Sequence, residues 1–257
     1  MDTPQLISSK ILLVGDSCVD EYLIGHVSRL SPEAPVPIVD ITETISSGGM
    51  AANVLSNLVS LGNEVDFLTN RHTLKKTRVI DSKSNQQLLR IDREGEIDSF
   101  DMASVLSAPT KYDAFVVSDY DKGFINLESL LKLIEIGHKQ NIPIFIDSKK
   151  INLFGVKDCF IKINQKEYDS LTMFSPDNEF IITLGDKGAR WKDRVIPTKK
   201  RSVFDVCGAG DTFLAAFVSA YLSGRDMMGS IEFANECASI AVTKLGCYAI
   251  TLEDIEN

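Results

Sequence analysis

The sequence predicts a doubly wound α/β sheet in which mostly parallel strands alternate with helices. Short apolar runs recur along the chain, and such runs are typical of strands that are buried on both faces. Between them lie longer stretches whose apolar residues recur at three- and four-residue steps, the period of an amphipathic helix. Strands and helices that alternate in this way form one open sheet covered by helices.

Each expected element rests on its own stretch of sequence. The expected strands are mainly apolar and occupy Ile11–Val14, Glu64–Leu68, Ala114–Val117, Ile142–Ile146, Phe160–Ile163 and Phe180–Leu184. The expected helices carry the periodic apolar residues and occupy Met50–Leu61, Leu127–Gln140, Thr212–Ser223 and Ile231–Leu245. Ligands of such sheets bind beyond the carboxyl ends of the strands, so we expect the functional residues in the polar or glycine-rich segments that follow them.

The segment Glu21–Ser47 departs from this alternation. It contains three prolines and short alternating runs such as Pro37–Ile41, which indicate β structure outside the main sheet. The sequence shows no internal repeat and no Gly/Ser-rich linker. We therefore expect a single domain over residues 1–257 with a small β lid at about residues 21–47.

Composition restricts the classes of function. With 44% apolar residues, the 257-residue chain can bury a full core, and its net charge of −9 argues against a broad nucleic-acid surface. The five cysteines lack metal-type spacing, and the amino-terminal residues resemble no export signal. No apolar stretch reaches the length of a membrane span. We expect a cytoplasmic protein without a nucleic-acid or membrane partner.

The segment DVCGAGDTF, Asp205–Phe213, predicts a phosphate-handling loop, because an apolar helix follows it directly. Gly208 and Gly210 allow a tight turn whose N–H groups point toward one spot, and the helix adds the positive end of its dipole. Asp211 stands at the same helix start, where its carboxylate can accept a proton from an attacking hydroxyl. The simpler interpretation is a turn followed by a helix cap. The segment lacks the GK[ST] of a Walker loop and a complete dinucleotide fingerprint.

This segment resembles the carboxyl-terminal signature of the ribokinase-like (PfkB) carbohydrate kinases. The other signature of that family is matched by GGMAAN at Gly48–Asn53. Within the family, the chain is most similar to the D-glycero-β-D-manno-heptose-7-phosphate kinase branch, on the segments Val14–Val39, Asn85–Asp92, Ser118–Gly123 and Ile146–Lys150. The resemblance implies a ribokinase-like three-layer α/β/α sandwich and the use of ATP with Mg²⁺.

The resemblance also implies roles for single residues. It gives Asp211 as the catalytic base, with an anion hole formed by Gly208, Ala209 and Gly210. It places around the sugar Asp16, Asp20, Gly48, Gly49 and Asn53. It assigns to the nucleotide Thr183, Gly185, Gly188, Asp205 and Asn235, and to magnesium and its waters Asn164 and Glu167 of the NQKE segment, with Glu167 acting on the metal through water. Taken singly, each of these could be an ordinary loop or cap residue.

A basic cluster in this acidic chain predicts a phosphorylated acceptor. The candidate contacts for the sugar phosphate are Lys76, Arg78, Arg90 and Lys149. The resemblance to the heptose kinase branch implies which sugar this is, so we expect transfer of phosphate to the anomeric hydroxyl of D-glycero-β-D-manno-heptose 7-phosphate, which gives the 1,7-bisphosphate. We also expect a homodimer, and a separate nucleotidyltransferase that acts downstream.

The chain is shorter than the family pattern in two places. About one βα unit is missing near residues 69–76, and one helix is missing near residues 169–180. Both losses fall at the periphery of the expected sheet, and the first leaves the edge near residues 64–80 exposed. Two alternatives therefore stay open: a kinase of another sugar or nucleoside, and a catalytically silent sugar-phosphate-binding protein.

Overall fold

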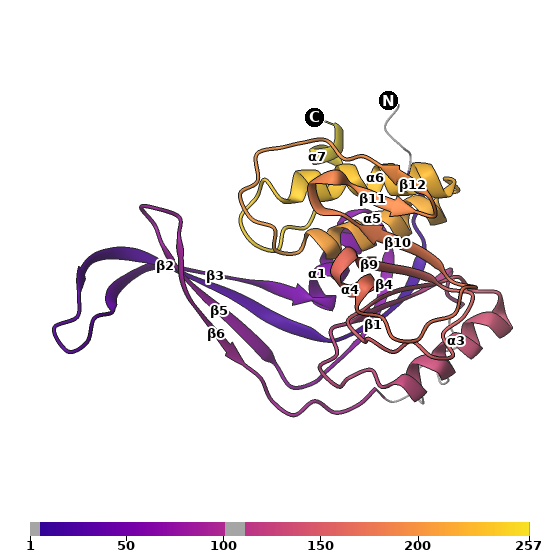
Figure 1. Cartoon of the computed structure of the whole chain (residues 1–257), viewed down its shortest axis with the longest axis horizontal. Helices are drawn as coiled ribbons and strands as arrows, with labels where there is room; N and C mark the ends of the chain where they lie inside the picture. Colours follow the sequence, from indigo (N-terminus) through magenta and orange to yellow (C-terminus); the bar gives the residue numbers. More distant parts are fainter. Residues whose placement is uncertain (1–5, 101–110, 257) are drawn as a thin grey trace.

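A computed structural model describes residues 6–100 and 111–256 (Figure 1). In this part of the chain the main sheet has eight strands in the order β12-β11-β10-β9-β8-β7-β1-β4. Their bounds are β1 Lys10–Gly15, β4 Glu64–Thr69, β7 Ala114–Asp119, β8 Ile144–Ser148, β9 Phe160–Asn164, β10 Glu179–Thr183, β11 Ala189–Trp191 and β12 Arg194–Ile196. The six neighbouring strands β4, β1, β7, β8, β9 and β10 pair in parallel. The strands β11 and β12 complete the sheet with antiparallel pairing. The predicted α/β class is confirmed.

Helices cover both faces of the sheet, which explains why its central strands are mainly apolar. On one face lie α1 Ala51–Ser60, α5 Ala209–Leu222, α6 Met227–Ala241 and α7 Leu252–Glu256; on the other lies α3 Leu127–Gln140. Ile11 and Leu13 of β1 pack into the first core, and Leu12 and Val14 pack into the second. Alternate residues of one strand thus serve two cores, because successive side chains point to opposite faces of a sheet.

A second sheet projects from this body as an extended arm (Figure 1). Its strand order is β3-β2-β5-β6, with β2 Ser17–Leu30, β3 Pro37–Met50, β5 Leu74–Asp81 and β6 Gln87–Arg93. The sequence predicts β structure outside the main sheet at about residues 21–47, and in the structure this segment belongs to a long hairpin of β2 and β3, which β5 and β6 extend. We call these four strands the lid sheet. Its exposed apolar side chains include Leu30, Ile41, Ile45, Leu89 and Ile91.

Two of the predicted helices, α5 and α6, start earlier than the sequence pattern predicts. α5 begins at Ala209, so Gly210 and Asp211 belong to its first turn, and α6 begins at Met227. Gly208 is the N-cap of α5 in the left-handed conformation, and the side chain of Asp226 caps α6 by accepting from the Gly229 N–H. The prediction was late because glycine is a poor helix former and was assigned to a loop. At the first turn of a helix that cost is small, because the N–H groups there have no helical partner.

Both shortened segments are visible in the structure. The chain passes from β4 at the edge of the main sheet to β5 of the lid sheet with only residues 70–73 between them. Between β9 and β10 there is only the short helix α4 Gln165–Asp169, followed by a loop.

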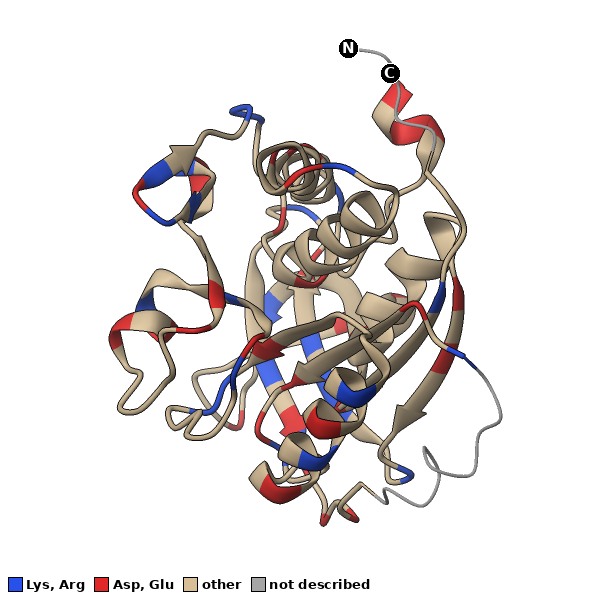
Figure 2. Ribbon diagram, turned by 90° about the vertical axis from the view of Figure 1, so that its right-hand side faces the viewer, with Lys and Arg blue, Asp and Glu red and all other residues tan. Residues whose placement is uncertain are grey.

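Surface charges alternate along the solvent face of α3, as Figure 2 shows. Lys132 pairs with Glu128 and Lys139 pairs with Glu135, each at the i,i+4 spacing that supports an exposed helix. Among the described residues, no helix is both long and apolar enough to cross a bilayer.

Candidate active site

Asp211 is buried where three distant parts of the chain meet. It stands in the first turn of α5 and is 3% exposed. Its Oδ2 accepts a hydrogen bond of 3.1 Å from the Nδ2 of Asn53 in α1, and its Oδ1 accepts one of 2.6 Å from the hydroxyl of Tyr120, which follows β7. Asn53 is held in turn by Asn57, whose Nδ2 donates to the Asn53 carbonyl at 2.9 Å. The carboxylate is therefore positioned from both sides.

The electrostatics of this site suit a general base. Burial raises the pKa of Asp211 to about 6, while the hydrogen bonds from Tyr120 and Asn53 and the charge of Lys162 act to lower it. A carboxylate with this pKa is mostly ionised at pH 7 and binds a proton more strongly than an exposed aspartate does. General bases work best when their pKa lies near the operating pH.

The turn before α5 is built to bind an anion. Gly208 has a φ of 75°, and a Cβ atom there would lie 2.4 Å from the Asn53 Nδ2, so glycine is required on both counts. Ala209 and Gly210 then open the 14-residue helix α5. The N–H groups of a first helical turn have no helical carbonyl partners, and the helix dipole adds partial positive charge. The predicted anion hole and the buried carboxylate of Asp211 thus lie side by side.

A buried ion pair lies beneath this turn. The ammonium of Lys162 in β9 pairs with the carboxylate of Asp147 in β8 at 2.5 Å, and the two residues are 4% and 2% exposed. A Cβ atom at Gly210 would lie 2.8 Å from the Lys162 Nζ, so glycine lets this ammonium approach the helix start. Burial acts to raise the pKa of Asp147, but the charges of Lys162 and Lys149 hold it below its usual value. The pair brings a fixed positive charge close to the anion hole.

The predicted sugar-side residues line the junction between the lid sheet and the body. Asp16 is fully buried and its carboxylate accepts from the backbone N–H groups of Tyr120 at 2.7 Å and Phe124 at 3.2 Å, so it positions the loop after β7. At Gly49 a Cβ atom would lie 2.0 Å from the Asp20 carboxylate, and at Gly48 it would lie 2.8 Å from the Ala52 Cβ. These two glycines allow β3 to pass close to β2 before α1 begins.

The four predicted cations occupy different environments. The ammonium groups of Lys76 and Lys149 lie 5.5 Å and 5.3 Å from the centre of the Tyr120 ring, so both face the ring that holds the base. Arg78 is buried and pairs with Asp20 inside the lid sheet.

Arg90 lies elsewhere. Its guanidinium is exposed and donates two hydrogen bonds of 2.7 Å to Asp92 of the same strand. The structure thus brings Lys76 and Lys149 together at the site, and it pairs Arg78, Arg90 and also Lys149 with carboxylates.

The predicted nucleotide residues surround a cavity of about 420 Å³ beside the anion hole. Thr183, Gly185, Gly188 and Asn235 all line it, together with Ala209, Gly210, Phe213, Val242 and the basic residues Lys199, Lys200 and Arg201. The Asn235 Nδ2 also donates to the Ile196 carbonyl at 2.9 Å and so holds β12 against α6. A cavity of several hundred cubic ångströms with mixed apolar and basic walls fits a nucleotide.

Asp205 does not line this cavity. Its carboxylate accepts from the N–H groups of Cys207 at 2.9 Å and Gly246 at 3.0 Å, so it joins the turn before α5 to the segment after α6.

Asn164 and Glu167 form a capping box at the start of α4. The Asn164 Oδ1 accepts from the Glu167 N–H at 2.9 Å, and the Glu167 Oε2 accepts from the Asn164 N–H at 2.8 Å. The other Glu167 oxygen pairs with Lys149 at 2.5 Å, and all three residues line a second cavity of about 360 Å³. One carboxylate and one amide, both engaged within the protein, fit contact with the water shell of Mg²⁺ better than direct ligation.

The site contains three residues that the sequence argument left without a role: Tyr120, Lys162 and Asp147. Tyr120 and Asp147 each follow an apolar strand, which is where functional residues are expected in such a sheet. Lys162 could have been found as a lysine inside the apolar strand Phe160–Ile163, since a buried lysine is rare without a charged partner.

The sequence profile described as pfkB family carbohydrate kinase matches residues 68–254. Among curated relatives, the Bifunctional protein HldE of a Nitratiruptor species is 33% identical over 302 residues, which cover 96% of this chain and 64% of the relative. The HldE of Haemophilus influenzae (strain PittEE) is 30% identical, with 97% of this chain and 63% of the relative covered. This chain therefore spans about 64% of the length of such relatives.

Solved structures share the fold at lower identity. Phosphofructokinase-2 from Escherichia coli in complex with potassium superimposes with a TM-score of 0.75 at 16% identity, over 97% of both chains. Ribokinase from Thermotoga maritima gives a TM-score of 0.68 at 19% identity, over 96% of this chain and 98% of the other. At these identities the likeness concerns the ribokinase-like fold alone.

Proposed function

Because the chain belongs to the pfkB family of carbohydrate kinases, we propose that it transfers the terminal phosphoryl group of ATP to a hydroxyl of a sugar phosphate. The observation that carries this proposal is the position of Asp211, a buried carboxylate in the first turn of α5, next to the anion hole and the 420 Å³ cavity. A base, an anion hole and a nucleotide-sized cavity are the parts that phosphoryl transfer requires.

In the proposed mechanism, Asp211 accepts the proton of the acceptor hydroxyl as the new oxygen–phosphorus bond forms. The bond between the γ-phosphorus and the bridging oxygen breaks, and ADP leaves. The N–H groups of Ala209 and Gly210 and the start of α5 stabilise the negative charge on the transferred group, with the ammonium of Lys162 close behind them. Tyr120 and Asn53 hold the base in place through their hydrogen bonds. Mg²⁺, when bound, would neutralise charge on the phosphates, with its water shell held near Glu167 and Asn164.

For the acceptor we propose D-glycero-β-D-manno-heptose 7-phosphate, phosphorylated at its anomeric hydroxyl to the 1,7-bisphosphate. The heptose-kinase-like segments of the sequence support this choice, as does the similarity to HldE proteins. Lys76 and Lys149, which converge on Tyr120, supply positive charge for the sugar phosphate.

A substrate panel tests this proposal. The purified chain is incubated with Mg-ATP and heptose 7-phosphate, the same heptose without its phosphate, or fructose 6-phosphate, and products are identified by phosphorus NMR. We expect a 1,7-bisphosphate from the first sugar and much slower turnover with the others. Equal turnover of the two heptoses would contradict a phosphate-binding acceptor site.

A kinase of another sugar is the second candidate, and the shortened segment between β4 and β5 favours it. Only residues 70–73 connect these strands, so contacts that a longer turn could make to the sugar are absent from the described residues. Turnover of fructose 6-phosphate above that of heptose 7-phosphate would decide for this candidate. A catalytically silent binding protein would show no ATP turnover with any sugar.

The exposed apolar residues of the lid sheet support a homodimer, since patches of this kind on a projecting arm are commonly covered by a second subunit. The relatives are named bifunctional, so we further propose that a nucleotidyltransferase acts on the product, either in a longer form of this protein or as a separate chain. The need for ATP and the five free cysteines support action in the cytoplasm.

A further inference from the structure

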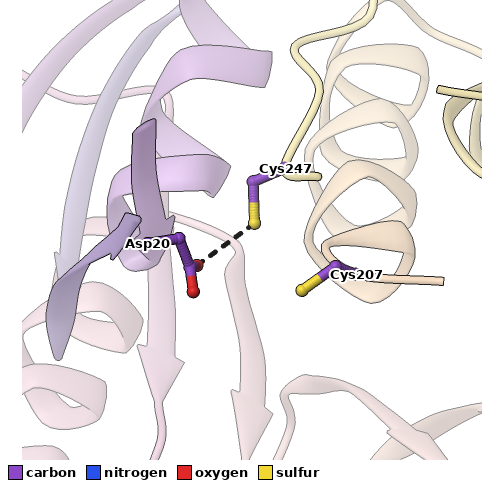
Figure 3. Close-up of side chains that lie close together, drawn as sticks. All are labelled: Asp20, Cys207 and Cys247. Atoms are coloured by element: carbon purple, nitrogen blue, oxygen red, sulfur yellow. Dashed lines mark hydrogen bonds between the residues drawn. The ribbon is translucent and has the colours of Figure 1, made fainter. Parts of the chain in front are cut away.

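Two cysteines lie close together at the junction of the lid sheet and the turn before α5 (Figure 3). The Sγ atoms of Cys207 and Cys247 and a carboxylate oxygen of Asp20 all lie within 4.8 Å of one another. Cys247 donates to the Asp20 Oδ2 at 3.3 Å, and the Arg78 guanidinium donates to the Cys207 Sγ at 3.2 Å. The mechanism proposed above uses neither cysteine.

We propose that Cys207 and Cys247 form a peroxide-sensitive thiol pair that closes to a disulfide and thereby switches off the enzyme. In the first step the Cys207 thiolate attacks a hydroperoxide; the sulfur gains an oxygen to become a sulfenic acid, the O–O bond breaks, and hydroxide or an alcohol leaves. In the second step the Cys247 sulfur attacks that sulfenic acid; the S–S bond forms, the S–O bond breaks, and water leaves with the thiol proton.

The surroundings assign different roles to the two sulfurs. The pKa of Cys207 is lowered to about 7 by its contact with the Cys247 side chain and by the positive charge of Arg78, so a large share is thiolate near neutral pH. The same contact raises the pKa of Cys247, which keeps it a thiol until Cys207 is oxidised. Burial raises the pKa of Cys18 and of Cys159 to about 12, so those thiols are poor nucleophiles.

The two residues of the pair differ in burial from the other cysteines. Cys207 and Cys247 are only partly buried, whereas Cys18, Cys159 and Cys237 are buried. The nearest of these, Cys18, has its Sγ 4.0 Å from the Asp20 Oδ2, so it is the one competing partner at this junction.

Closure would disturb the anion hole. Cys207 directly precedes Gly208, and a Cβ atom at Gly208 would lie 3.3 Å from the Cys247 Sγ, so the two segments already touch. A disulfide requires an S–S length of about 2.05 Å, shorter than any contact between separate sulfur atoms, so the two sulfurs must approach each other. We expect this approach to draw on the backbone of Cys207 and so to shift Gly208, the start of α5 and Asp211. The loss of turnover rests on the proposed kinase function, whereas the disulfide chemistry does not.

The same three groups could be read as metal ligands. A soft divalent ion could take both sulfurs and the Asp20 carboxylate. Arg78 argues against this, because its guanidinium already pairs with Asp20, contacts Cys207 and would repel a cation. Zinc binding is therefore an outcome of the test that would overturn the proposal.

The experiment treats the reduced full chain with hydrogen peroxide in the presence of a chelator. Peptide mapping without reductant is expected to find a Cys207–Cys247 crosslink, and turnover with Mg-ATP in excess is expected to fall by at least about tenfold and to recover with dithiothreitol. In Cys247→Ser, dimedone should trap a sulfenic acid on Cys207. Cys207→Ser should form no crosslink and keep its turnover under peroxide. Cys159→Ala is the matched control and should respond like the wild type.

The outcomes separate the two proposals. If the crosslink forms but the untreated chain phosphorylates no sugar, the thiol pair stands and the kinase proposal fails. If the untreated chain is an active kinase and peroxide yields no Cys207–Cys247 peptide, or yields a Cys18 crosslink instead, the inference is overturned. Stoichiometric zinc binding that is lost in both Cys207→Ser and Cys247→Ser would overturn it in favour of a metal site.

Discussion

At the scale of single residues, Asp211 carries a cost in stability that its chemistry explains. Its pKa is about 6 in the folded protein, above its ordinary value of 3.8, and burial is the main cause. Below about pH 4, Asp211 is protonated in both the folded and the unfolded protein, and it does not lower the free energy of unfolding. Above about pH 6 it is ionised in both, and the free energy of unfolding is lowered by the full amount. A buried base destabilises the protein at the pH where it works.

Asp211→Asn is expected to lose activity and gain stability. Turnover should fall by about 10²–10⁴, the range for removal of a positioned general base. The free energy of unfolding at pH 8 should rise by up to about 3 kcal/mol, because the amide carries no charge, and this gain should vanish near pH 4. Steady-state kinetics and urea unfolding at both pH values measure the two effects. Asp193→Asn, in an exposed turn, is the control and should change neither.

Tyr120→Phe should change the pH profile of the enzyme. The Tyr120 hydroxyl donates to Asp211 and acts to lower its pKa, so its removal should raise that pKa. The acidic limb of the turnover profile should then move to higher pH, with little loss at alkaline pH. Tyr248→Phe removes a hydroxyl that donates to Asp254 away from the site and should leave the profile unchanged. An unshifted profile in Tyr120→Phe would remove Tyr120 from its positioning role.

The sequence alone identified the candidate site residues that lie within glycine-rich signatures. It did not identify the residues that contact them from distant parts of the chain. Gly208, Gly210 and Asp211 stand together in the sequence, so a local pattern exposes them. Lys162 lies in β9 and Tyr120 directly follows β7. Only the order of the strands in the sheet brings these two residues to the start of α5. A local pattern holds no information on such a distant contact.

At the scale of elements, the short helix α4 begins with a capping box formed by the same two residues that we propose to act on the water shell of Mg²⁺. Its capping box is local, since Asn164 and Glu167 are three residues apart, and so it could be read from the sequence as either a cap or a metal site. The structure shows the cap directly and adds the pairing of Glu167 with Lys149. The cap uses one oxygen of the carboxylate, the other pairs with Lys149, and the residue lines the second cavity, so the cap alone does not occupy the whole carboxylate.

Glu167→Gln should separate these roles. Glutamine can keep the capping box, but it removes the negative charge beside the proposed water shell of Mg²⁺. The Mg²⁺ concentration for half-maximal rate should rise several-fold, while the melting temperature and the apparent affinity for the sugar change little. Glu128→Gln makes the same change in the first turn of α3, far from the site, and serves as the control. An unchanged Mg²⁺ requirement would contradict the role of Glu167.

At the scale of the whole molecule, Arg78 ties the lid sheet to the body. It lies in β5, pairs with Asp20 of β2, and reaches across to Cys207 before α5. The sequence indicated β structure outside the main sheet at about residues 21–47, but the pairing of β2 with β5 requires a parallel contact between residues more than fifty positions apart, which no periodicity reveals. The size of the lid sheet was therefore not predictable.

Arg78→Ala should lower the free energy of unfolding by about 3–5 kcal/mol, because it leaves the buried Asp20 carboxylate without its partner. Adding Asp20→Asn should restore much of that loss. If Arg78 also contacts the sugar phosphate, calorimetry should show affinity for it weakened by about 1.5–3 kcal/mol in both variants, with ATP affinity unchanged. Full recovery of sugar-phosphate affinity in the double variant would mean that Arg78 acts only on structure.

The hydrogen bond between Asn53 and Asp211 joins residues 158 positions apart. A contact of such separation requires closure of a long loop, which costs chain entropy. During synthesis the amino-terminal part folds first, so a nascent chain that has emerged as far as β10 already carries Asn53, Asp16 and the lid sheet but not Asp211. Under the proposed mechanism, an unfinished chain of this length holds sugar-side residues without the base, and so it transfers no phosphate.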